Sequence, residues 1–415
     1  MWNKRKPELL APAGDLEKLK IAVLYGADAV YIGGEAYSLR AKAKNFDRDT
    51  MAEGIRFAHA HGAKVYVTAN IFAHNADFEG MADYFREIYQ LGADAVLISD
   101  LGVFAVAREA VPDLEIHVST QANNTNYQSA NMWYRLGARR VVVARELSLK
   151  EIREIRERIP EDMEIEAFVH GAMCISYSGR CLLSNYLSGR DANKGACAHP
   201  CRWKYHLVEE TRPGEYMPIE ENERGTYIYN SKDLCMIDHI PDLVEAGVVS
   251  LKIEGRMKTP FYVGTVIKAY RRAIDDYFTD PVLYEKQLPI YLEEVSQASH
   301  REYTTAFYYG KPDGNQQVYT SNSYIRPYDF IGMVQEDSDT DGYAWIEQRN
   351  KFSVGEEIEV LPAKGDSFTM TVTEIQNEAG EAVESAPHPQ EKLRLKFSRP
   401  VHAFDMMRKF ISDTK

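Results

Sequence analysis

A short phrase recurs through the first two-thirds of the chain, and each copy runs from a glycine into a β-branched apolar segment. The copies are YGADAVYIGG from Tyr25, HGAKVYVTAN from His61, LGADAVLISD from Leu91, LGARRVVVAR from Leu136 and AGVVSLKIEG from Ala246. Glycine commonly follows the last turn of a helix, and a continuous Val/Ile run is typical of a strand that is buried on both faces. The repeat therefore predicts helices that lead into the strands of a parallel sheet.

Three further segments complete the series of predicted strands: ELLAPAG from Glu8, EIHVSTQ from Glu115 and EIEAFVHG from Glu164. Amphipathic helical patterns such as DLEKLKIAVLYG and LKEIREIRERIP separate the strands. Eight strand–helix units over roughly 275 residues match an α/β fold of the TIM-type (β/α)8 barrel. An open doubly wound sheet is the alternative, but no GxGxxG motif follows the first strand. We therefore expect residues 1–275 to form the barrel.

The pattern changes twice after the predicted barrel. Residues 276–324 form a helical stretch and a Tyr-rich connector. From about Ile325, apolar and polar residues alternate between DTDG and AKGD turns, which predicts a small antiparallel β-barrel domain over residues 325–415. Domains of this kind bind RNA or simply pack against a neighbour, and the sequence leaves both roles open.

Polar residues stand at the ends of the predicted strands, where barrels of this type have their active sites. Any solvent-facing mouth also needs polar side chains, so each of these residues taken singly has a structural alternative. Glu35, His170 and Glu254 are the candidates for proton transfer during catalysis. The residues expected to ring the mouth are Glu35, Asn70, Asp100, Gln121, Arg145, Glu146, His170, Glu254 and Arg256.

All five cysteines fall between residues 174 and 235, in a predicted insertion at residues 171–235 that follows the seventh strand. Scattered buried thiols and a zinc site are two interpretations, but such clustering argues against scatter and no CxxC pair is present. A long loop with irregularly spaced cysteines favours an iron–sulfur cluster. Ser231 in the segment NSKD can cap a helix, which predicts that Cys235 lies on the first turn of a helix. An odd number of thiols and no apolar stretch long enough to cross a bilayer predict a cytoplasmic protein without a membrane segment.

Three segments together resemble the collagenase-like peptidase family (U thirty-two). They are ELLAPAGDLEKLKIAVLYGADAVYIGG, SLRAKAKNF and EAFVHGAMCISYSGRCLLSNYLSGRDANKGAC. The resemblance spans the chain and, within the family, is greatest to bacterial tRNA hydroxylation proteins. It implies an enzyme that makes 5-hydroxyuridine at the wobble position of tRNA, with a [4Fe-4S] cluster and a requirement for prephenate. The cluster ligands that it implies are Cys174, Cys181, Cys197 and Cys235, with Cys201 as the spare thiol.

The expected partners follow from the same resemblance. A net charge of −13 argues against indiscriminate coating of nucleic acid, but a local basic group next to the cysteines is compatible with one anticodon loop. The candidates for RNA binding are Arg180, Arg190, Lys194, Arg202, Lys204 and the stacking residues Trp203 and Tyr177, although a solvated loop explains the charges equally well. A dicarboxylate such as prephenate needs cations. The predicted substrate-binding residues are Arg40, Asn70, Gln121, Arg145, Lys252 and Arg256.

Two other functions stay open at this point. A hydrolase matching the family name would lack the HExxH and GxSxG motifs. Its cysteines would either bind a metal structurally or include a nucleophile with His170 or His199 as its base. A non-catalytic subunit that pairs with a homologous partner is the other alternative.

Overall fold

The computed structural model describes residues 5–38, 45–173, 183–188, 190, 197–198, 200, 232–310 and 325–411. Eight parallel strands close into a barrel, because each pairs with the next and β7 pairs through β9 with β1. The strands are β1(Glu8–Pro12), β2(Ala29–Gly33), β3(Lys64–Ala69), β4(Ala95–Ile98), β5(Glu115–Val118), β6(Arg140–Val142), β7(Glu164–Ala172) and β9(Ser250–Ile253). The predicted α/β fold of the TIM type is confirmed, and every predicted strand is present.

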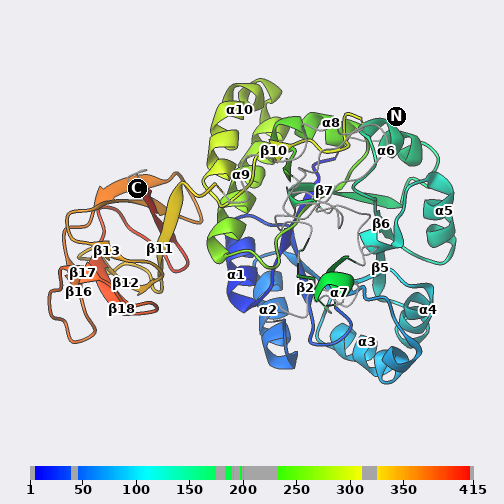
Figure 1. Cartoon of the computed structure of the whole chain (residues 1–415), viewed down its shortest axis with the longest axis horizontal. Coiled ribbons are helices and arrows are strands. Elements are labelled where there is room, and N and C mark those ends of the chain that lie inside the picture. The colour runs from blue at the N-terminus through cyan, green and yellow to red at the C-terminus, as the bar shows by residue number, and fades with distance from the viewer. Residues whose placement is uncertain are drawn as a thin grey trace, which may run out of the picture.

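Helices surround these strands (Figure 1). They are α1(Leu16–Leu24), α2(Arg48–Ala60), α3(Met81–Gln90), α4(Leu101–Ala110), α5(Tyr127–Arg135), α6(Leu149–Arg156), α8(Ile240–Glu245) and α9(Pro260–Thr279). The repeated glycine has the conformation that the sequence pattern implies, since φ is 109° at Gly26 and 90° at Gly247, where the chain turns from a helix toward a strand. Within the described ranges, no helix combines the length and the apolar character of a membrane span.

Side-chain caps begin several of these helices immediately after the barrel strands. Asp15 accepts a hydrogen bond from the backbone of Lys18, and Ser148 forms a capping box with Glu151 at the start of α6. Asp100, which the sequence analysis assigned to the mouth, accepts hydrogen bonds from Gly102 N and Val103 N and caps α4. The carboxylate of Asp100 therefore has a structural role at a strand end.

The described parts of the insertion add a short helix and a strand to the barrel. Helix α7 spans Leu183–Ser188, and strand β8(Asp233–Cys235) pairs antiparallel with β7 so that Cys235 lies opposite His170. Strand β10(Tyr303–Thr304) pairs in parallel with β8. The sequence prediction that Cys235 begins a helix was wrong, because Cys235 ends β8 and the 3-10 turn η5(Ile237–His239) follows it.

The C-terminal part is a curled antiparallel sheet with a core of its own. Its strands are β11(Tyr328–Val334), β12(Tyr343–Gln348), β14(Glu357–Leu361), β15(Phe368–Thr371), β16(Ile375–Gln376), β18(Lys392–Lys396) and β19(Met406–Phe410), in the spatial order β15-β14-β19-β11-β12-β18-β16. A separate pair joins β13(Phe352–Ser353) to β17(Ser385–Ala386). Burial alternates along β12, as the alternating sequence predicts.

The C-terminal domain lies beside α1, α9 and α10(Pro281–Ser296) (Figure 1). The hydroxyl of Tyr25 on α1 donates to the carbonyls of Leu361 at 2.8 Å and Phe404 at 3.1 Å. Met406 of β19 belongs to the same buried apolar cluster as the barrel core. The two parts are therefore joined by a buried interface that includes hydrogen bonds.

Candidate functional site: a cationic pocket at the barrel mouth

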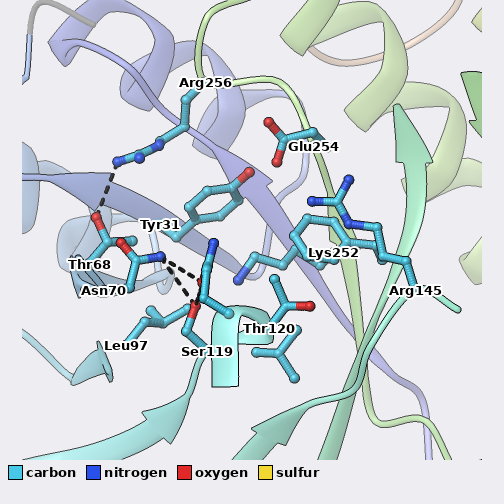
Figure 2. Close-up of a pocket in the computed structure, with 13 residues that line it drawn as sticks. Tyr31, Thr68, Asn70, Leu97, Ser119, Thr120, Arg145, Lys252, Glu254 and Arg256 are labelled. Carbon is cyan, nitrogen blue, oxygen red and sulfur yellow. Dashed lines mark hydrogen bonds between the residues drawn. The ribbon is translucent and has the colours of Figure 1, made fainter. Parts of the chain in front are cut away.

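A pocket of about 40 Å³ opens at the carboxyl ends of the barrel strands (Figure 2). Its lining comes from strand ends that are far apart in sequence, as expected for this fold. The lining residues are Tyr31, Thr68, Asn70, Leu97, Ser119, Thr120, Gln121, Val142, Arg145, Phe168, Lys252, Glu254 and Arg256. The structure thus brings together six of the predicted site residues, namely Asn70, Gln121, Arg145, Lys252, Glu254 and Arg256.

Arg256 is held in the pocket by hydroxyl groups. Its Nη1 donates to Ser38 Oγ at 2.9 Å and to Thr68 Oγ1 at 3.1 Å, and the side chain is buried. A Cβ atom on Gly33 would lie 2.4 Å from Arg256 Nη1 and 2.4 Å from Ser38 Oγ, so a side chain at this point of β2 would displace the guanidinium or the hydroxyl. These hydroxyl contacts fix the direction of the guanidinium, whose planar set of donors matches an anionic group such as a carboxylate.

Arg145 supplies a second cation on the opposite side of the pocket in Figure 2. Its Nη1 donates to the carbonyl of Ala172 at 2.8 Å, and its guanidinium carbon lies 4.2 Å from the centre of the Phe168 ring. Its Nε atom is buried and has no hydrogen-bond partner among the described residues. A buried donor of this kind beside a pocket is available to a ligand.

Lys252 is the third cation of the pocket. Its Nζ lies 2.7 Å from Glu166 Oε1, 4.4 Å from the centre of the Tyr31 ring and 5.4 Å from that of Phe168. Burial lowers the pKa of Lys252, and the adjacent Glu166 carboxylate opposes that effect. Glu166 and the two aromatic rings therefore fix the position of this ammonium group.

A buried ionic network extends below Lys252 into the barrel. Arg140 contacts Glu8 at 2.7 Å, Glu164 at 2.7 Å and Glu166 at 3.0 Å. Burial alone would raise the pKa of Glu166, but Lys252 and Arg140 hold this pKa below its ordinary value. Sequence reasoning missed the network, although charged residues inside the otherwise apolar segments RRVVV and EIEAF were a usable signal.

Amide and hydroxyl groups form the polar wall from β3 and the segment after β5. Asn70 Nδ2 donates to Ser119 Oγ at 3.2 Å and to Gln121 Oε1 at 3.1 Å, and Asn70 is buried. Gln121 lies in the 3-10 turn η2(Thr120–Ala122), which ends at Asn123 with φ of 53°. These neutral groups supply hydrogen bonds to a ligand without adding charge.

Glu254 is the one carboxylate among the residues that line the described pocket. Its backbone is fixed, because Glu254 N donates to His170 O at 2.9 Å and Tyr262 donates to Glu254 O at 3.2 Å. A Cβ on Gly171 would lie 2.5 Å from Glu254 O, and φ at Gly171 is 106°. The close packing of β7 against this segment therefore directs the carboxylate of Glu254 among the pocket cations, as Figure 2 shows.

The other two predicted catalytic residues are not part of the pocket lining. Glu35 follows β2 and is exposed. His170 is buried among aromatic rings, with its ring centre 5.5 Å from that of Tyr270 and 5.4 Å from that of Tyr303. Burial, with smaller effects of Lys258 and His300, lowers the pKa of His170 to about 3. The imidazole is therefore neutral near neutral pH, and its placement favours packing over proton transfer.

Two of the four predicted cluster ligands lie within the described residues. Cys197 is half-buried, Cys235 is buried, and both thiols are free of disulfide bonds. Cys235 Sγ lies 4.0 Å from the hydroxyl of Tyr270, and burial raises the pKa of this thiol to about 12. Cys174 and Cys181 lie outside the described residues, and the described ones contain no group of three metal-binding side chains. A desolvated free thiol fits a cluster ligand, because a bound metal would stabilise its thiolate.

Most of the predicted RNA-binding residues also fall outside the described ranges. Arg190 is the member that the structure places, and its Nη2 donates to the carbonyl of Cys197 at 3.2 Å. This contact confirms that a basic residue lies next to a cysteine of the insertion. The RNA-binding candidates outside the described ranges are Tyr177, Arg180, Lys194, Arg202, Trp203 and Lys204, and the substrate-binding candidate Arg40 also lies outside them.

A TIM-type barrel with a polar pocket at its mouth and an added antiparallel β-domain defines an α/β-barrel protein with an enzyme-like site. The chain belongs to peptidase family U32, because the profile of Peptidase family U32 matches residues 14–318. The profile of the Peptidase family U32 C-terminal domain matches residues 326–408. The family resemblance inferred from the sequence is therefore confirmed.

Individual relatives match over most of the chain. The chain is 42% identical over 405 residues to tRNA hydroxylation protein P1 of Bacillus subtilis. This alignment covers 98% of this chain and 95% of the relative. The chain is 39% identical to tRNA hydroxylation protein P of Escherichia coli, over 92% of each chain. A 23S rRNA 5-hydroxycytidine synthase of Escherichia coli is 38% identical over 66% of this chain and 40% of its own length.

Proposed function

We propose that this protein is an RNA-modifying enzyme that hydroxylates the wobble uridine of tRNA to 5-hydroxyuridine. The similarity to tRNA hydroxylation protein P1 carries this proposal, because it extends over 98% of this chain and 95% of the relative. A second relative is named for 5-hydroxycytidine in ribosomal RNA, so two related proteins are named for RNA hydroxylation, and one of the names specifies a pyrimidine. Single-stranded bases of an anticodon loop can be presented to a pocket without opening a duplex.

The mouth pocket supports a small anionic co-substrate. Arg145, Lys252 and Arg256 give it three cations, and Asn70 and Gln121 add neutral hydrogen-bonding groups. A dicarboxylate of the prephenate type matches two guanidinium groups and an ammonium group in charge. We therefore assign the prephenate requirement to this pocket, with Glu254 as the group that accepts or donates a proton at the reacting centre.

A [4Fe-4S] cluster held by Cys174, Cys181, Cys197 and Cys235 completes the proposed enzyme. Such a cluster supplies one-electron transfer or a rigid framework at the mouth. The free, desolvated thiol of Cys235 is compatible with this role. The basic residues of the insertion, of which Arg190 lies beside Cys197, are proposed to hold tRNA phosphates.

A cysteine-peptidase function receives no support from the thiol that the structure describes in most detail. A nucleophilic cysteine needs a lowered pKa and a basic partner. Burial instead raises the pKa of Cys235 to about 12 and lowers that of the neighbouring His170 to about 3. Burial therefore disfavours both the thiolate of Cys235 and the imidazolium of His170, and with them a catalytic ion pair.

Nucleoside analysis of tRNA tests the proposal directly. Cells that lack this chain, and any related chain of overlapping activity, are expected to lose hydroxylated wobble uridine from tRNA, and a plasmid copy is expected to restore it. An unchanged nucleoside profile would reject tRNA hydroxylation. If the purified chain alone hydroxylates tRNA from these cells in vitro, without a second protein, a merely accessory role is also excluded.

A further inference from the structure

A second cavity, of about 260 Å³, lies between the barrel and the C-terminal domain. Helix α9 supplies residues at helical spacing, and α10 supplies a second row on its facing side. The third wall comes from β14, the turn that follows it and β19. The lining residues are Thr265, Lys268, Ala269 and Arg272 from α9, Ile290, Glu293, Glu294 and Gln297 from α10, and Glu359, Leu361, Asp366, Ser367 and Arg408 from the C-terminal domain.

Among the residues that the structure describes, four buried polar atoms of this lining have no hydrogen-bond partner. They are Thr265 Oγ1, Glu294 Oε2, Gln297 Oε1 and Arg408 Nη1. The side chains of Thr265 and Arg408 are almost fully buried, at 3% and 2% exposed. Unpaired polar atoms are costly inside proteins, so four of them around one cavity indicate a missing polar occupant.

Among these atoms, the one on the wall of the C-terminal domain is a hydrogen-bond donor, and those on the wall of α10 are acceptors. Arg408 uses Nε and Nη2 to bind Glu359 at 3.0 and 2.7 Å, which leaves Nη1 as a charged donor on the wall of the C-terminal domain. Glu294 uses Oε1 to bind Arg272 at 3.1 Å, which leaves Oε2 as a charged acceptor on α10. Gln297, one helical turn further along, adds a second acceptor to the same face.

We propose that this interdomain cavity binds a free α-amino acid. Its carboxylate would accept hydrogen bonds from Arg408 and Thr265, and its ammonium group would donate to Glu294 and Gln297. An anion alone is disfavoured because Glu293, Glu294, Glu359 and Asp366 share the lining with three cations. Because the ligand contacts both α10 and β19, it stabilises the docking of the C-terminal domain on the barrel.

Thermal unfolding of the full-length purified protein, with isothermal titration calorimetry, tests the site. We use each proteinogenic amino acid as a probe at millimolar concentrations, with acetate and methylamine as half-ligands. At least one amino acid is expected to raise the melting temperature saturably, and neither half-ligand is expected to do so at the same concentration. No shift with any amino acid, or an equal shift with acetate or methylamine, would overturn the proposal.

Variants locate the effect in the cavity. Thr265→Val and Gln297→Met keep side-chain size but remove one polar partner each, and we expect the affinity to fall about tenfold or more, as for the loss of one hydrogen bond to a charged group. Thr369→Val, at an exposed position of β15, is the matched control and should bind as the wild type does. Each shift is measured from the melting temperature of that variant without ligand. Unchanged affinity in both cavity variants would place the binding elsewhere and overturn the assignment.

Discussion

At the scale of single residues, the pocket cations differ in how the protein holds them. Arg256 is oriented by hydroxyl groups, whereas Lys252 is paired with the buried carboxylate of Glu166. A hydroxyl acceptor orients a cation but carries no charge, whereas a carboxylate orients the cation and also compensates its charge. Replacing Lys252 would remove a charge partner of the buried Glu166 carboxylate, so Arg256 is the more suitable residue for a test of ligand binding.

We predict that Arg256→Lys lowers kcat/KM for tRNA hydroxylation about tenfold or more, because lysine cannot keep the fork geometry and one charge-assisted hydrogen bond is worth about 1.5–3 kcal/mol. Steady-state kinetics with purified tRNA, with urea unfolding beside it, measures both effects. Arg86→Lys at an exposed position of α3 is the control and should leave both unchanged. Wild-type kinetics in Arg256→Lys would remove this arginine from the substrate site.

The Glu164 carboxylate predicts how the free energy of unfolding depends on pH. Burial would raise its pKa, but Arg140 and Arg5 lower the pKa to about 2 from the ordinary 4.5. Its folded-state pKa is depressed, so its stabilising effect is present above pH 4.5 and is lost as pH falls toward 2. The free energy of unfolding of the wild type should thus exceed that of Glu164→Gln by a margin that shrinks over this window.

Urea unfolding at a series of pH values measures that margin. Glu154→Gln, at an exposed position of α6, is the control and should differ little from the wild type at every pH. A margin for Glu164→Gln that stays constant from pH 4.5 toward 2 would show that the carboxylate is not held ionised by Arg140.

At the scale of the elements, the sequence predicted the strands well because five of the eight are apolar runs that follow a glycine. The site was harder to predict. Asn70, Gln121, Arg145, Glu254 and Arg256 were found because they stand at strand ends, where geometry alone brings them together. Of the pocket residues inside strands, the charged Lys252 was predicted, whereas Tyr31, Leu97 and Phe168 carried no such local signal.

The errors have physical causes as well. Strand β8 was mistaken for a helix start because its three residues are stabilised by pairing with β7 and β10, which lie far away in sequence. Asp100 was placed in the mouth ring, but an aspartate between a strand and a helix also caps the helix. His170 stands at a strand end, yet its side chain packs under Tyr262 and Tyr270. Tertiary contacts decide each of these cases.

Strand β2 offers a test of how an element positions the pocket. Gly33→Ala puts a methyl group 2.4 Å from Arg256 Nη1, so the guanidinium must move and the affinity for an anionic co-substrate should fall. We expect a loss of stability of about 1–3 kcal/mol, as is usual for overpacking. Urea unfolding and the KM for the co-substrate measure the two effects.

Ser148→Ala is the matched control for Gly33→Ala. It removes the capping box of α6, whose residues do not line the pocket, and should cost about 1 kcal/mol of stability without changing KM. If KM rises equally in both variants, the change in KM of Gly33→Ala results from general destabilisation and not from displacement of Arg256.

At the scale of the whole molecule, the proposed cluster joins cysteines that are distant in sequence. We predict that anaerobically purified protein contains iron and acid-labile sulfide, and that serine at Cys174, Cys181, Cys197 or Cys235 removes most of both. Cys201→Ser should retain them. Iron and sulfide assays with visible absorption spectra measure this, and wild-type protein without iron after anaerobic reconstitution would reject the cluster.

The ionic network also closes the amino-terminal end of the barrel, since Glu8, Arg140 and Glu164 are the first residues of β1, β6 and β7. A molecule that enters the barrel through the mouth must therefore also leave through the mouth. If a small co-substrate sits at the bottom and a nucleotide base follows it, the base blocks the exit until it withdraws. Turnover would then be ordered, with the small molecule first to arrive and its remnant last to depart.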